Sequence, residues 1–370
     1  MTGPLADLGA TLPVVAAPMA GGPSRPQLVI AAARAGATGF LAAGYKTADE
    51  LERQIVEVSK QTRRFGVNLF VPNQVSISAE QLRRYRDAVE GWLQDYSISV
   101  AQTGSATVPD WLAGVQLPDQ ISTDAQDAWS QKLQVLEANP VPLISLTFGL
   151  SAIEDIARLQ NTGAKVLVTV TNLAEARQAE AAGADAVIVQ SSAAGGHSGA
   201  WTPSREPSTE DLTEDLTELL AQIQSEVDLP LWAAGGIATP DAVRDVLLAG
   251  AQAAVVGTVL LRSPESGTHW VHQQALADAD PERETVVTTA YSGRPARALP
   301  NAFTEALTQE APLGFPGLHF LTAGLRRSFA AGGDPAGVNL WAGTGFAHAR
   351  QEPAGEILRR LSSASSLSGD

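Results

Sequence analysis

The chain has 370 residues, a length that suits one large α/β barrel carrying insertions. Its 25 basic and 40 acidic side chains give a net charge of −15, which disfavours nucleic acid and anionic membrane surfaces as partners. It contains no cysteine, which excludes disulfides, thiolate metal sites and a cysteine nucleophile. In chain order, residues 1–10 lack the basic and apolar segments of a signal peptide, and no later apolar run reaches about 18 residues. These features predict a cytoplasmic protein.

Short apolar runs alternate with amphipathic stretches along most of the chain. The amphipathic stretches predict helices, among them 48–60, 152–160, 173–181 and 241–248. Since each connection between runs has room for a crossover helix, the strands are predicted to pair in parallel, and their number favours a closed TIM (β/α)8 barrel. The eight predicted strands are 14–19, 38–43, 65–70, 143–148, 166–171, 186–190, 231–234 and 253–257.

A Gly-Ala pair recurs where a predicted helix joins the next predicted strand. Glycine suits the left-handed residue that ends a helix, and alanine allows a tight turn into the strand. The repetition of one join indicates one supersecondary unit used several times. The pairs are Gly36-Ala37, Gly163-Ala164, Gly183-Ala184 and Gly250-Ala251.

Two stretches interrupt the alternation of strands and helices. Residues 72–140 are too long for one βα unit and predict an insertion. Residues 277–350 are rich in loops and aromatic residues, and they predict a smaller substrate-binding lid. We therefore expect the barrel within residues 1–276, completed by a terminal helix at about 352–364.

The loops after predicted strands 7 and 8 have the composition of a phosphate site. They contain Gly235-Gly236 and Gly257-Thr258, and phosphate ligands of TIM barrels favour these two loops. Glycine lets the backbone approach a phosphate closely, and the helix that starts near Pro240 presents free N–H groups. The alternative is a pair of tight turns that bind no ligand.

The loop after predicted strand 6 carries the main catalytic candidate, His197. This histidine follows Gly195-Gly196 at the carboxyl end of a strand, where core packing does not require it. A neutral imidazole could accept or donate a proton there, although a role in loop structure is the alternative. Gln190 could offer its amide to a ligand. The remaining histidines, His269, His272, His319 and His348, are expected to be structural, since a spacing of three residues alone makes a poor metal site.

Predicted strands 1 and 3 end in further candidates. Ala17-Pro18-Met19 precedes small residues that leave room for a flat ring, and Asn68 is a polar residue inside an apolar run. The alternatives are a simple strand end and an amide paired within the barrel core. No strand is followed by the Gly-x-Gly-x-x-Gly fingerprint of a dinucleotide-binding domain.

Taken together, these segments resemble the nitronate monooxygenase family, formerly 2-nitropropane dioxygenases, and are most similar to its class I. The matching motifs are AAPMAGG (16–22), GVNLFVP (66–72), AGGHSG (194–199), LWAAGGI (231–237), VVGT (255–258) and SGRPAR (292–297). Members are FMN-dependent barrels that oxidise alkyl nitronates with O2 to carbonyl compounds and nitrite. The chain departs from the family pattern at Ala193, Ser198 and Thr344.

The resemblance implies roles for individual residues. His197 matches the catalytic histidine, Met19 and its neighbours line the flavin, and Asn68 and Gln190 bond to it. Around the cofactor it places Gly195, Gly236, Val256, Gly257 and Thr258.

Three hypotheses follow for the function. The first is a nitronate monooxygenase in which Arg294 holds the small anionic nitronate and Tyr291 excludes water. The second is an NAD(P)H-dependent flavin reductase of the enoyl-thioester or quinone type on the same barrel. The third is a flavin- or phosphate-binding protein without turnover. The oligomeric state stays open, with a homodimer as one option.

Overall fold

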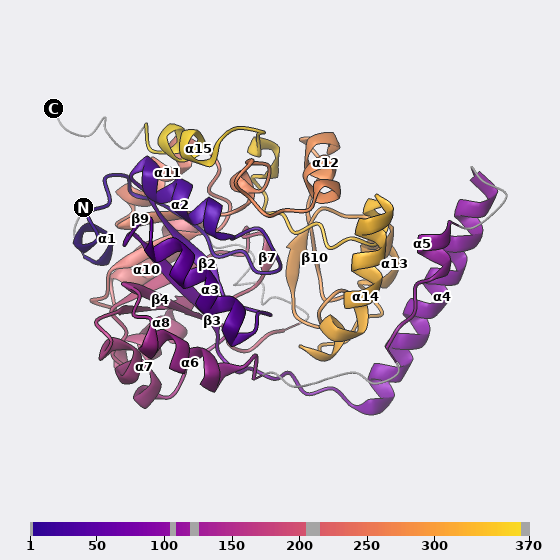
Figure 1. The fold of residues 1–370 in the computed structure, drawn as a ribbon, viewed down its shortest axis with the longest axis horizontal. Coiled ribbons are helices and arrows are strands. Elements are labelled where there is room, and N and C mark those ends of the chain that lie inside the picture. Colours follow the sequence, from indigo (N-terminus) through magenta and orange to yellow (C-terminus); the bar gives the residue numbers. More distant parts are fainter. Residues whose placement is uncertain (1–2, 104–108, 119–125, 205–214, 364–370) are drawn as a thin grey trace.

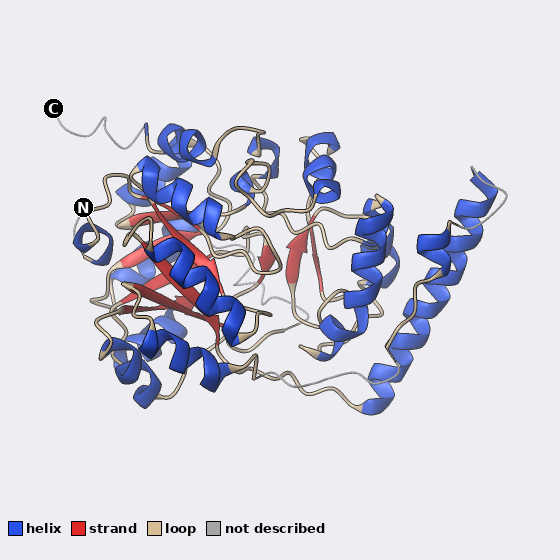
Figure 2. Ribbon diagram, viewed as in Figure 1, coloured by secondary structure: helices blue, strands red, loops and turns tan. Residues whose placement is uncertain are grey.

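The structure, a computed structural model, describes residues 3–103, 109–118, 126–204 and 215–363. Eight strands close into a barrel in the order β1-β2-β3-β4-β5-β6-β8-β9, and all neighbouring pairs are parallel (Figures 1 and 2). The predicted TIM (β/α)8 barrel is therefore confirmed. Its strands are β1 Val14–Ala16, β2 Thr38–Ala42, β3 Phe65–Phe70, β4 Leu143–Thr147, β5 Lys165–Val170, β6 Ala186–Gln190, β8 Leu231–Ala234 and β9 Ala253–Val256.

The repeated Gly-Ala joins have the predicted conformation. Gly36, Gly163, Gly183 and Gly250 all have φ between 82° and 99°, in the left-handed region that favours glycine. The N–H of Gly36 also donates to Ala32 and Ala33, which ends α2 as a capped helix.

The barrel strands separate two layers of apolar side chains. One layer fills the barrel interior and includes Phe40, Trp232 and Val255. The other lies between the strands and the surrounding helices and includes Val256. Adjacent residues of one strand thus face opposite layers. The surrounding helices are α2 Pro26–Ala35, α3 Ala48–Ser59, α6 Trp129–Ala138, α7 Ile153–Gln160, α8 Leu173–Ala181, α10 Leu216–Gln224, α11 Pro240–Leu248 and α15 Ala354–Leu361.

A second cluster of buried apolar side chains lies beside the barrel, on the right in Figure 1. It joins α4, from the middle of the chain, to α13 and α14 near the C-terminus. Trp92 of α4, for example, packs 5.0 Å from Phe303 of α13 and 5.6 Å from Phe329 of α14, measured between ring centroids. The helices of this region are α4 Ala79–Thr103, α5 Asp110–Ala113, α12 Trp270–Asp278, α13 Ala302–Leu307 and α14 Gly317–Gly332.

A small antiparallel sheet links the two regions. Its strands are β10 Val286–Thr288, β11 Ala296–Ala298 and β7 Gly196–His197, in the order β10-β11-β7. His197 thus lies on a short strand paired with Ala296, where the sequence predicted a loop. A strand of two residues leaves no periodic signal in a sequence. In the described part of the chain, no helix has the length and apolar character needed to cross a membrane.

Candidate active site

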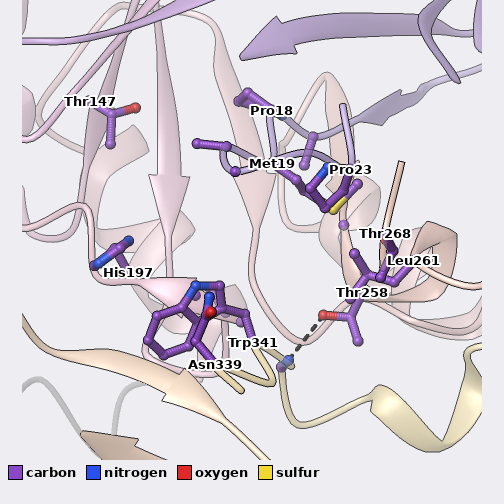
Figure 3. A pocket seen from close by; sticks show the side chains of 18 of the residues that line it. Pro18, Met19, Pro23, Thr147, His197, Thr258, Leu261, Thr268, Asn339 and Trp341 are labelled. Atoms are coloured by element: carbon purple, nitrogen blue, oxygen red, sulfur yellow. Dashed lines mark hydrogen bonds between the residues drawn. The ribbon is translucent and has the colours of Figure 1, made fainter. Parts of the chain in front are cut away.

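A cavity of about 550 Å³ opens at the carboxyl ends of the barrel strands. Residues from the barrel loops and from the second region both line it, and Figure 3 shows His197, Met19, Thr258 and Trp341 around it. Most of the residues proposed from the sequence meet here. Those on the cavity wall are Ala17, Pro18, Met19, Asn68, Gln190, Gly195, Gly196, His197, Gly235, Gly236, Gly257 and Thr258.

Three residues proposed from the sequence do not line the cavity. Val256 points outward to the helices, and its neighbours Val255 and Gly257 line the cavity instead. Tyr291 is fully buried, with its hydroxyl donating to Asn301 Oδ1 and Val338 O. Arg294 is also fully buried, 4.0 Å above the Phe148 ring. The structure thus places Tyr291 and Arg294 behind the cavity wall.

His197 lies in an aromatic environment at the cavity. Its ring centroid is 5.4 Å from that of Trp341, 5.8 Å from Phe148 and 6.0 Å from Phe315. Burial lowers the pKa of His197 to about 3, and the positive charges of Arg294 and Arg326 act in the same direction. The imidazole is therefore neutral at physiological pH.

Glycine loops form part of the cavity wall. A Cβ atom on Gly195 would lie 2.4 Å from the backbone nitrogen of Gly343, so only glycine allows these two segments to meet. The backbone N–H groups of Gly195, Gly235 and Gly236 donate no hydrogen bond to another described residue. Gly235 and Gly236 lie in the loop that leads into the amino end of α11, which begins at Pro240. Free amides beside a helix amino terminus attract an anion such as a phosphate.

A row of polar side chains crosses the barrel end from β3 to β5. Asn68 donates from Nδ2 to Ser145 Oγ and to Thr147 Oγ1, each at 2.9 Å. Thr147 Oγ1 lies 3.2 Å from Thr169 Oγ1. Because the amide nitrogen of Asn68 is already engaged, its Oδ1 is the atom left to accept a bond from a ligand. The Oε1 atom of Gln190 likewise accepts from Gly199 N at 2.7 Å. Its Nε2 donates one hydrogen to His197 O at 3.5 Å, which leaves the second hydrogen for a ligand.

The wall contributed by α14 carries a positive charge. Arg326 lines the cavity and donates to Thr322 Oγ1 at 3.1 Å and to the His319 carbonyl at 3.0 Å. Within the described part of the chain it has no carboxylate partner. Burial lowers the pKa of Arg326 to about 10, so its guanidinium is still charged at neutral pH.

Tyr45 faces this charge from the loop after β2. Its ring stacks on His319 at 4.0 Å, with an interplanar angle of 5°. Its hydroxyl is buried and has no hydrogen-bond partner in the described part of the chain. A buried hydroxyl without a partner is costly, so the atom is ready to bond to a ligand. Arg326 and Tyr45 thus offer the cavity a positive charge and an unpartnered hydroxyl.

A buried ion pair holds the Tyr45 backbone in a left-handed conformation, with φ of 65°. Asp127 Oδ1 accepts from Tyr45 N at 3.0 Å, and Asp127 Oδ2 accepts from Lys132 Nζ at 2.6 Å. Lys132 is 1% exposed and also donates to Ala43 O. A non-glycine residue at positive φ costs of order 1–3 kcal/mol and persists only where its surroundings enforce it. The Lys132–Asp127 pair therefore positions Tyr45 over the cavity.

Sequence reasoning missed several residues of the cavity wall. Tyr45 follows a barrel strand, so the rule that identified Met19 and Asn68 could have found it. Arg326, Asn339 and Trp341 come from the second region and carried no such signal. Three of the histidines that were expected to be structural, His269, His272 and His319, also line the cavity.

Comparisons with known proteins identify the family and the fold. The model of the family described as nitronate monooxygenase matches residues 3–363. A probable nitronate monooxygenase of Bacillus subtilis is 31% identical over 350 residues, which cover 92% of each chain. The solved structure of a nitroalkane oxidase from Streptomyces ansochromogenes is 41% identical, with a TM-score of 0.86 and 98% of each chain covered. FabK from Thermotoga maritima shares the fold at 24% identity, with a TM-score of 0.69, 98% of this chain and 95% of that chain.

Proposed function

The chain belongs to the nitronate monooxygenase family, and on that premise we propose that it oxidises small alkyl nitronates with O2 and bound FMN to a carbonyl compound and nitrite. One observation carries this proposal: His197, the Arg326 guanidinium and the glycine loops meet at one cavity. A nitronate is a small anion, and a protein with a net charge of −15 repels it unless local donors bind it.

The donor set of the cavity fits a flavin mononucleotide. We assign the phosphate to the free amides of Gly195, Gly235 and Gly236, because backbone N–H groups beside a helix amino terminus stabilise a dianion. The amide of Gln190 and the free Oδ1 of Asn68 offer one donor and one acceptor to the edge of the ring. When bound, the flavin supplies electron transfer between the nitronate and O2.

The remaining side chains suit an anionic substrate. Arg326 and the Tyr45 hydroxyl bind the nitronate oxygens, in place of the buried Arg294. His197 either contacts this anion or accepts the α-proton of a neutral nitroalkane. Phe148 and Trp341 exclude water from the reacting atoms. Because Asn339, Trp341 and Arg326 all lie within residues 277–350, we assign this stretch as the substrate-binding lid.

Gly195→Ala should weaken FMN binding. The new methyl group would lie 2.4 Å from Gly343 N, and forcing it in costs about 1–3 kcal/mol, so FMN affinity should fall roughly tenfold or more. The measurement is fluorescence quenching of FMN titrated into the flavin-free protein. Gly91→Ala is the matched control, because a Cβ atom at this position of α4 meets nothing within 4 Å. Equal affinities for the two variants would remove Gly195 from the cofactor site.

The activity toward a neutral nitroalkane should stay constant as the pH falls from 8 to about 5. An ordinary histidine becomes protonated below about pH 6.5, whereas the pKa of His197 is about 3. The imidazole of His197 should therefore stay neutral across this range. The measurement is the pH profile of kcat/KM, which reports the protonation of groups in the free enzyme. The same shift means that the unfolded chain binds the proton more readily, so the free energy of unfolding should decrease as the pH falls from about 6.5 toward 3. A loss of activity centred near pH 6.5 would contradict this assignment.

The primary test uses the purified protein. We expect a flavin spectrum and O2 uptake with ethyl nitronate. Rapid anaerobic bleaching by NADPH, without O2 uptake on nitronates, would favour the reductase hypothesis. A coloured protein with no turnover of any kind would favour a binding protein, and a colourless protein that fails to quench added FMN would contradict the proposal.

A further inference from the structure

The hydroxyl of Ser292 lies at the junction between His197 and the lid. Its Oγ is 2.9 Å from His197 Nε2 and 3.2 Å from the carbonyl oxygen of Arg294. The N–H of Arg294 donates to the same Oγ at 3.3 Å. Ser292 lines the cavity beside His197 but is only 2% exposed. Its hydrogen bonds therefore influence which ring nitrogen of His197 carries the proton.

A count of hydrogens decides which atom donates. The hydroxyl of Ser292 has one hydrogen, a carbonyl oxygen only accepts, and a backbone N–H only donates. The contacts are all satisfied when Ser292 donates to Arg294 O and accepts from the Arg294 N–H and from His197 Nε2–H. In the opposite arrangement, Ser292 donates its one hydrogen to His197 Nε2. No hydrogen is then left for the hydrogen bond to Arg294 O. The complete set requires the imidazole to carry its proton on Nε2.

The other ring nitrogen of His197 is available in the cavity. In the described part of the chain Nδ1 has no hydrogen-bond partner, and it is not among the fully buried polar atoms. With the proton on Nε2, Nδ1 presents a lone pair to the substrate.

Several contacts tie the segment of Ser292 to that of His197. The Arg294 guanidinium lies 4.0 Å from the centroid of the Phe148 ring, and its Nε donates to Ser198 O at 3.3 Å. Ser198 N donates in turn to Pro295 O at 2.9 Å, beside the pairing of His197 with Ala296. Arg294, behind the cavity wall, thus joins the segment of Ser292 to that of His197.

We propose that Ser292 is a positioning residue that fixes the tautomer of His197, so that Nδ1 accepts the α-proton of a neutral nitroalkane. In this step the C–H bond breaks, the N–H bond forms at Nδ1, and the released electron pair forms the C=N bond of the nitronate. The products are an imidazolium and a nitronate anion, an ion pair without net charge. The other tautomer would point an N–H at the substrate and could only donate to it. The inference rests on the proposed function and extends its substrates to neutral nitroalkanes.

Nuclear magnetic resonance of the FMN-bound protein with 15N-labelled histidine tests the tautomer directly. Protonated and bare imidazole nitrogens have different 15N shifts, and the His197 signals are those that disappear in His197→Asn. We expect a bare Nδ1 in the native protein and a mixture of tautomers in Ser292→Ala. A protonated Nδ1 in the native protein, or an unchanged tautomer in Ser292→Ala, would overturn the proposal.

Kinetics separate positioning from a merely structural role. We expect Ser292→Ala to lower kcat/KM for nitroethane roughly tenfold or more, with a much smaller loss for ethyl nitronate, which has no α-proton to give up. Ser292→Thr, which keeps a hydroxyl, should restore most of the loss. Ser263→Ala is the matched control, because its buried hydroxyl donates to Leu260 O away from the cavity. Equal losses for both substrates would contradict a positioning role. Native protein without activity on nitronates would contradict the proposed function, while the 15N shifts still decide the tautomer.

Discussion

His197→Asn should lower turnover of neutral nitroalkanes by a factor of roughly 10² to 10⁴, the usual contribution of a general base. Asparagine keeps a polar side chain of similar reach but has no lone pair basic enough to take a proton from carbon. Ethyl nitronate has already lost its proton, so its oxidation should decrease far less. The measurement is initial O2 consumption with nitroethane and with ethyl nitronate, together with the flavin content from the visible spectrum.

The control for this experiment is His348→Asn. His348 is exposed and does not line the cavity, so activity and flavin content should match those of the native protein. If His197→Asn oxidised both substrates at native rates, His197 would have no part in the reaction. If it lost bound flavin, the residue would act chiefly in cofactor binding.

The barrel could be predicted from sequence because its signals are local. Each apolar run is a strand that buries both faces, and each Gly-Ala pair marks a helix end that needs positive φ. The predicted bounds of β3, β6 and β8 are those of the structure. The second region could not be assembled in this way. Trp92 and Phe303 pack together across more than 200 residues of sequence, and nothing in either segment indicates the other.

The residues of the candidate site likewise fall into those that local sequence signals predict and those that depend on tertiary packing. His197, Asn68 and the glycine loops follow barrel strands, so the fold itself predicts that they meet. Val256 differs from Val255 only in the side of the strand it faces, and sequence does not fix that alternation in a strand buried on both sides. Arg294 belongs to a motif that the family resemblance singled out, but burial gives it a role behind the wall. The positive charge on the cavity wall comes from Arg326, on a helix whose docking onto the barrel is a tertiary feature.

Arg326→Met should weaken the binding of nitronates specifically. Methionine keeps much of the apolar stem but removes the charge, and a hydrogen bond to a charged group contributes about 1.5–3 kcal/mol. We therefore expect KM for ethyl nitronate to rise roughly 10- to 100-fold, since each 1.4 kcal/mol is a factor of ten. KM for nitroethane, which enters the cavity without a charge, should change little. Steady-state O2 consumption at varied concentrations of both substrates measures the difference.

Arg64→Met provides the matched control for the loss of an arginine. Arg64 is also half-buried and donates to backbone carbonyls, those of Leu8 and Ala33, but it precedes β3 at the other end of the barrel. Its loss can affect stability but leaves the cavity charge unchanged, so both KM values should stay native. Arg326→Lys should recover part of the nitronate affinity, because it restores the charge without the planar fork of donors. If Arg326→Met raised both KM values equally, the guanidinium would shape the cavity, and the anion would have to be bound by the Tyr45 hydroxyl and the loop amides.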